Sequence, residues 1–93
     1  MSPQVHGEPE ELRRFAAALR QYRQILEQST YGMEGRARQL GETWHDQEYQ
    51  KFLQNWETTR RAVDRFLSVC DEYVSHVLIK AQRLDDYLRS GKL

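Results

Sequence analysis

The stretch that decides the fold is "LGETWHDQEYQKFLQNW", residues 40–56, because it interrupts two long helical patterns. Its glycine, threonine and aspartate are typical of the turns that separate helices. Trp44 stands out in this turn, since such segments usually carry polar side chains. An indole can lie across the open end of a helical hairpin as an apolar plug, with its N–H reaching water or a carbonyl.

The pattern before the turn predicts a helix over about residues 9–41. Pro9 suits a first helical position, and Glu10 and Glu11 suit the positive first turn. Apolar residues then follow at alternating spacings of three and four, as on one face of a helix. They are Leu12, Phe15, Leu19, Tyr22 and Leu26. Gly41 is predicted to end this helix in a left-handed conformation.

One segment of the first helix is weak. "STYGMEG", residues 29–35, contains two glycines and a threonine, which cost about 2 kcal/mol of helix propensity relative to alanine. The segment is either a tolerated weakness or kink, or a place where a partner helix approaches the backbone closely. Tyr31 lies off the apolar stripe there and is a candidate exposed contact.

The pattern after the turn predicts a second helix over about residues 46–90. Thr43 followed by Asp46 resembles a capping box, and Asp46 is an alternative cap by itself. The helical stripe comprises Tyr49, Phe52, Trp56, Thr59, Val63, Phe66, Cys70, Tyr73, Val77, Leu84 and Tyr87. A flanking row comprises Leu53, Leu67, Val74, Leu78, Ala81 and Leu88. Gly91 is predicted to end the helix.

Two long helices joined by a short turn, about residues 42–46, predict an all-α antiparallel hairpin that forms a single domain over residues 1–93. Adjacent residues such as Phe66 and Leu67 point about 100° apart, so one faces the first helix and the other faces water. A second hairpin is expected to cover this surplus and complete a four-helix bundle. The expected core or dimer residues are Phe15, Leu19, Tyr22, Leu26, Trp56, Val63, Phe66, Cys70, Tyr73, Val77 and Leu84.

Composition argues against several classes of protein. Lys plus Arg equals Asp plus Glu at fourteen each, so the basic excess of a nucleic-acid-binding protein is absent. No apolar run approaches the roughly 18–20 residues of a spanning helix, and the polar helix faces mix both charge signs. The first fifteen residues lack the apolar core of a secretory signal peptide. Nucleic-acid binding, membrane association and export by the general route are therefore not expected.

Catalytic and metal-binding patterns are also weak. His45, Asp46 and Glu48 lie close together, but no two histidines have the spacing of a helical metal site. Asp85 and Asp86 are adjacent on a helix and diverge, so they cannot form an acid–base pair. The single cysteine can form neither an internal disulfide nor a zinc site alone. The chain is predicted to be non-enzymatic, without a metal or cofactor.

The residues Leu40, Trp44, Tyr49 and Phe52, followed by a heptad-like second helix, resemble the WXG-motif family, the ESAT-like small proteins of type VII secretion. The resemblance implies hairpins that pair, as homodimers or with a related hairpin, into four-helix bundles. It also implies export of the folded protein from the cytoplasm without a cleaved signal, or pairing with a larger effector. By this resemblance an export ATPase or partner recognises a turn motif of Trp44, Asp46, Tyr49 and Phe52.

Two features depart from the family pattern. Asp46 replaces the family's glycine, although aspartate tolerates turn conformations and can cap a helix. The family's tail signal, a tyrosine followed four residues later by an acid, is missing, because Val77 follows Tyr73 and Gly91 follows Tyr87 at that distance. If the chain is exported, a sibling protein must carry that signal, so the missing signal favours a heterodimer or a non-exported relative over a self-sufficient homodimer. The alternative is a generic dimeric helical adaptor or chaperone, in which Trp44 only plugs the bundle.

Overall fold

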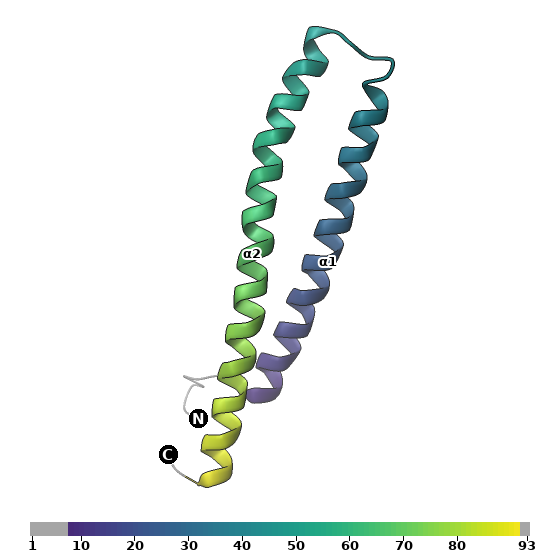
Figure 1. The fold of residues 1–93 in the computed structure, drawn as a ribbon. Helices are drawn as coiled ribbons and strands as arrows, with labels where there is room; N and C mark the ends of the chain where they lie inside the picture. Colours follow the sequence, from purple (N-terminus) through teal and green to yellow (C-terminus); the bar gives the residue numbers. More distant parts are fainter. Residues whose placement is uncertain (1–7, 92–93) are drawn as a thin grey trace, which may run out of the picture. The chain divides into compact units, whose positions relative to one another are not determined.

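Two helices joined by a short turn make up the part of the chain that the computed structural model describes, residues 8–91 (Figure 1). Helix α1 spans Pro9–Leu40 and helix α2 spans Gln47–Ser90. No strand occurs within these residues. The predicted all-α hairpin is confirmed, and its pairing with a second hairpin stays a prediction.

The helix ends follow from local chemistry. Glu10 and Glu11 lie in the first turn of α1, where the helix dipole favours negative charge. Gly91, with φ of 75°, follows α2 in the left-handed conformation that ends many helices. The same conformation predicted for Gly41 is wrong, since Gly91 alone has a positive φ among residues 8–91. Gly41 instead extends the last turn of α1, with its amide bonded to the carbonyl of Ala37 at 3.2 Å.

The chain divides into two compact units, each containing a segment of both helices. The terminal unit contains the described residues up to Tyr22 and those from Val69 onward, and the turn unit is Arg23–Ser68. Within the turn unit Tyr49 contacts Ala37, and Trp56 contacts Glu34. From the first of these contacts to the second, the residue number falls on α1 and rises on α2, so the two helix segments run antiparallel.

Small side chains dominate the buried positions of the terminal unit, whereas the turn unit also buries Tyr49 and Leu67. Cys70 and Ala81 are only 1% and 0% exposed, and both lie on α2 in the terminal unit. Small residues let two helix backbones approach closely, which buries them well even in a pair of helices. The buried residues, which we call the seam, are Ala16, Thr30, Ala37, Tyr49, Leu67, Cys70, Val74 and Ala81.

The seam takes only some of the residues predicted as core or dimer contacts. Cys70 is buried, and six are half-buried: Leu19, Leu26, Trp56, Val63, Val77 and Leu84. Four are exposed: Phe15, Tyr22, Phe66 and Tyr73. These four are not core residues of the single hairpin, because the row with Leu67 and Val74 faces α1 instead. Their role as dimer contacts stays a prediction.

Helix α1 continues unbroken through residues 29–35, the segment predicted to be weak. A Cβ atom added to Gly32 or Gly35 would meet nothing within 4 Å. Neither glycine is therefore needed for close approach within the hairpin. Tyr31 is exposed, as predicted, and the guanidinium carbon of Arg60 lies 4.6 Å from its ring centroid.

Candidate interaction site

The turn between the helices is built on the last carbonyls of α1. The carbonyl of Leu40 accepts hydrogen bonds from the amides of Thr43, at 3.1 Å, and Trp44, at 2.9 Å. The Thr43 hydroxyl also reaches this carbonyl, at 3.4 Å. The end of α1 is thus satisfied by the turn itself, which fixes where Trp44 emerges from the backbone.

Asp46 is the cap of α2. Its Oδ1 accepts a hydrogen bond from the amide of Tyr49, three residues on, at 3.1 Å. This geometry decides between the two predicted caps in favour of Asp46. A hydrogen bond from the Trp44 side chain, followed by those from the Tyr49 and Glu48 amides, holds the pKa of Asp46 below its ordinary value of 3.8. The Asp46 carboxylate therefore interacts with both the Trp44 side chain and the first turn of α2.

Tyr49 joins the turn to α1. Its ring centroid lies 5.1 Å from that of half-buried Trp44, with the rings tilted by 51°. Its hydroxyl donates a 2.7 Å hydrogen bond to the carbonyl of Ala37, and only 6% of the residue is exposed. A Cβ atom on Gly41 would lie 2.3 Å from that hydroxyl oxygen. Glycine is therefore required at position 41 by the approach of a phenol ring and not by backbone conformation.

Three of the four predicted motif residues thus form one cluster, Trp44, Asp46 and Tyr49. Phe52 does not join them. Its ring stacks on that of Trp56, with centroids 6.4 Å apart and an interplanar angle of 20°. Phe52 is also 39% exposed, so it belongs to the surface of α2.

A polar network around Glu34 lies in the turn unit and escaped the sequence analysis. One Glu34 oxygen accepts bonds from the Trp56 indole at 3.1 Å and from Arg60 at 2.6 Å. The other accepts from Arg38 at 2.9 Å. The bond from Trp56, followed by that from Arg60, lowers the pKa of Glu34 from its ordinary value of 4.5. The four-residue spacing of Glu34 and Arg38 is visible in the sequence, whereas the bonds from α2 depend on the register of the two helices.

Exposed apolar side chains form what we call the aromatic flank. In the terminal unit they are Phe15, Tyr22, Val69 and Tyr73, and in the turn unit they are Ile25, Phe52 and Phe66. Phe15 precedes buried Ala16 on α1, and Tyr73 precedes buried Val74 on α2. Two antiparallel helices are related by a twofold axis perpendicular to both, so residues preceding equivalent seam positions lie on the same side of the pair. The aromatic side chains within each unit therefore share one side.

The opposite side of each unit is charged. In the terminal unit Arg13 of α1 forms an ion pair with Asp85 of α2, and both follow half-buried leucines. In the turn unit the Glu34 network occupies this side, and Arg60 also bonds Asp64 at 3.1 Å. Contacts between the helices thus satisfy the charged side, whereas the aromatic flank remains exposed.

Comparison with protein-family models, with curated proteins and with solved structures found no match in any of the three.

Two searches concerned other kinds of site. Over residues 8–91, no three His, Cys, Asp or Glu side chains are grouped as metal ligands. Neither helix, over the same residues, has the apolar length required to cross a membrane.

Proposed function

We propose that this chain is a non-enzymatic binding protein whose hairpin pairs, through its aromatic flank, with a second helical hairpin. The pairing would serve a type VII secretion substrate or a partner of a larger effector, as the WXG resemblance implies. The observation that carries the pairing is the exposure of Phe15, Tyr22, Phe66 and Tyr73, each between 43% and 54%. Large apolar side chains exposed on one side of each unit are typical of an interaction site.

The energy available to pairing can be estimated from these exposures. Full burial of a large apolar side chain contributes about 1.5–3 kcal/mol, so the exposed half of each flank residue contributes about 1 kcal/mol. Several such residues on each hairpin would supply enough to offset the several kcal/mol that association costs. A four-helix bundle is the arrangement that covers this face with like side chains.

The proposed export role places Trp44 on the surface that an export ATPase or effector recognises. The support is the resemblance in the turn, together with the rigid setting that Asp46 and Tyr49 give the indole. A generic adaptor role has its own support, since the Trp44 side chain interacts with the Asp46 carboxylate and lowers its pKa. An indole held in this way is also what a structural plug requires.

Pairing is tested by the variant Phe66→Asp. We expect the dissociation constant of the complex to rise about 100-fold or more, because a charge replaces an apolar contact. Ser68→Asp adds the same charge at an exposed position two residues away, outside the aromatic flank, and should assemble like the wild type. Sedimentation of purified protein, alone and co-expressed with neighbouring gene products, gives the masses. Equal assembly of the Phe66→Asp variant and the wild type would place the interface elsewhere.

A further inference from the structure

The row of exposed residues along α2 changes character toward its C-terminal end. Phe66 and Tyr73 are followed at the same seven-residue spacing by Lys80, and Val69 is followed at fourteen residues by Arg83. A seven-residue spacing keeps side chains on nearly the same side of a helix. The aromatic row therefore continues into a basic one.

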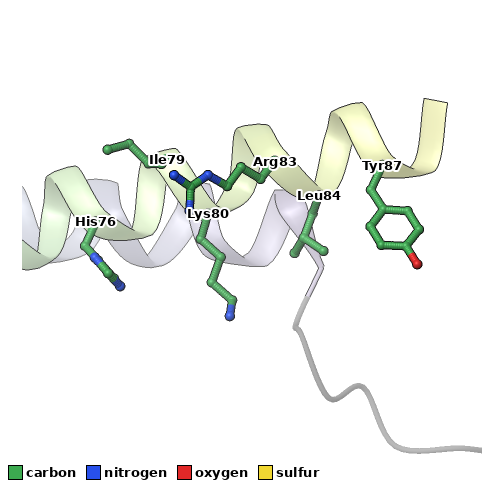
Figure 2. A pocket seen from close by; sticks show the side chains of 6 residues that line it. All are labelled: His76, Ile79, Lys80, Arg83, Leu84 and Tyr87. Carbon is green, nitrogen blue, oxygen red and sulfur yellow. The ribbon is translucent and has the colours of Figure 1, made fainter. Parts of the chain in front are cut away.

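The basic end of the row forms a groove in the terminal unit. The groove has a volume of about 390 Å³ and is lined by His76, Ile79, Lys80, Arg83, Leu84 and Tyr87. Figure 2 shows that all six side chains come from α2, with Arg83 running back along the helix in the direction of Ile79. Apolar walls with two cations suit a partner that presents carboxylates beside apolar side chains.

Lys80 and Arg83 form no ion pair with any of the residues that the structure describes. The nearby acids are already bonded. Asp85 pairs with Arg13, and Asp86 bonds Gln82 and pairs with Arg89. The groove is thus a site of uncompensated positive charge.

The same chain has uncompensated acids at its turn. Glu42 and Glu48 flank Trp44 and Asp46, and neither forms an ion pair within the described residues. No lysine or arginine occurs from Gly41 to Gln50. The turn therefore carries the charge that the groove lacks.

We infer that the groove binds the acidic turn of a second copy of this chain, with Lys80 and Arg83 facing Glu42 and Glu48 of that copy. The inference rests on the proposed function, because it assumes that pairing uses the aromatic flank. It specifies an antiparallel arrangement of the two α2 helices, with a basic end and an acidic end meeting twice in each dimer.

The spacing of the aromatic residues supports this arrangement. In an antiparallel pair, each step up one helix is a step down the other. When Phe52 lies opposite Tyr73 of the second copy, Lys80, seven residues beyond Tyr73, falls at position 45, seven before Phe52. Helix α2 of the second copy begins at Gln47, which falls opposite Leu78 in this register. Lys80 and Arg83 therefore lie just beyond the start of that helix, beside the turn that carries Glu42.

Other arrangements leave the cations without partners. A parallel pair would bring Lys80 and Arg83 against the same two cations, and like charges in contact are unfavourable. An antiparallel pair with Phe52 opposite Tyr87 would place Lys80 at Thr59 and Arg83 at Trp56, neither of which carries a charge. Charge thus favours the overlap between Phe52 and Tyr73.

Charge reversal and rescue test the inference. The double variant Lys80→Glu/Arg83→Glu should raise the dimer dissociation constant about tenfold or more, measured by sedimentation equilibrium at low salt. Glu42→Lys/Glu48→Lys should do the same, and the chain with all four changes should recover most of the affinity. Arg20→Glu/Arg61→Glu, the matched control, makes the same charge change at exposed positions away from the aromatic flank and should have little effect. Circular dichroism verifies that each variant is helical.

The results separate the two hypotheses. The inference is overturned if the wild type dimerises but the groove variants change the dissociation constant no more than the control does. It is also overturned if the chain with all four changes does not recover affinity. Either result leaves pairing by the aromatic flank intact. A wild-type chain that is monomeric alone also overturns it. If that chain stays single in the presence of its co-expressed neighbours as well, the proposed function fails too.

Discussion

The contact between Gly41 and Tyr49 gives a prediction whose sign is opposite to that of ordinary glycine replacement. A methyl group at position 41 would lie 2.3 Å from the Tyr49 hydroxyl oxygen and 2.9 Å from the ring carbon that bears it. Gly41 has no positive φ, so the backbone itself accepts alanine. The tyrosine must therefore move, and it loses its 2.7 Å bond to the Ala37 carbonyl.

The expected magnitude follows from these two losses. Forced displacement of a packed side chain costs about 1–3 kcal/mol, and a lost hydrogen bond costs about 0.5–1.5 kcal/mol. Replacement of glycine by alanine returns about 0.4–1 kcal/mol through the unfolded chain. We therefore expect Gly41→Ala to reduce the free energy of unfolding by about 1–3 kcal/mol. Chemical denaturation at fixed protein concentration, followed by circular dichroism, measures it.

Gly32→Ala and Gly35→Ala are the matched controls. Both positions lie inside α1 with open space where the methyl group would go, so each change should stabilise by about 0.5–1 kcal/mol. Tyr49→Phe in the Gly41→Ala background removes the atom closest to the new methyl group and should reduce the cost of that substitution. If Gly41→Ala stabilises the protein as Gly32→Ala does, the packing of Tyr49 on residue 41 is not what the structure describes.

Three further predictions concern the turn and the Glu34 network. Trp44→Ala should leave the hairpin paired and lower the free energy of unfolding by about 1–2 kcal/mol, because the indole is half-buried. The variant should also impair export or partner recognition. Normal export of a stable Trp44→Ala protein would mean that Trp44 acts only as a plug. Asp46→Ala should lower the melting temperature by removing the cap, whereas Asp46→Asn should retain most of it. The lowered pKa values of Glu34 and Asp46 mean that their stabilisation is complete above the ordinary values of 4.5 and 3.8 and is lost as the pH falls below them through the lowered values. Glu34→Gln should flatten this acid dependence, and an unchanged pH profile of thermal unfolding would show that the network is not stabilising.

Local chemistry made the helix boundaries predictable from the sequence. Pro9 begins α1 and Gly91 follows α2, where a first-position proline and a left-handed glycine are expected. For the N-terminal cap of α2 the sequence offered two candidates, Thr43 and Asp46, because both side chains can accept a hydrogen bond from a helix amide. The backbone path selected Asp46, and no residue pattern alone could decide that.

The seam was harder to predict, because α2 carries two apolar rows of equal period. The sequence left open which member of each adjacent pair, such as Phe66 and Leu67, faces the first helix; the structure buries Leu67 and leaves Phe66 exposed. The helices meet where small residues such as Cys70 and Ala81 let them approach. Since periodicity records which positions are apolar and not which neighbour covers them, the two rows are distinguished only by the register with α1.

The predictions for individual turn residues failed or succeeded for similar reasons. Gly41 was expected to be needed for its backbone conformation. The structure shows instead that the ring of Tyr49 packs against it. Tyr49 is held there by its hydrogen bond to the carbonyl of Ala37, which lies twelve residues away in the sequence. The Glu34 network requires a contact between residues 22 and 26 positions apart. Such contacts follow from the packing of two helices and have no signature in a local stretch of sequence.

The burial of Cys70 gives the protein a built-in reporter of its own opening. With 1% of this residue exposed, a thiol reagent can reach the sulfur only when the two helix segments of the terminal unit come apart. No other cysteine competes for the reagent. The labelling rate of the unaltered chain therefore measures how often those segments separate, and a partner that holds them together would slow the reaction in proportion.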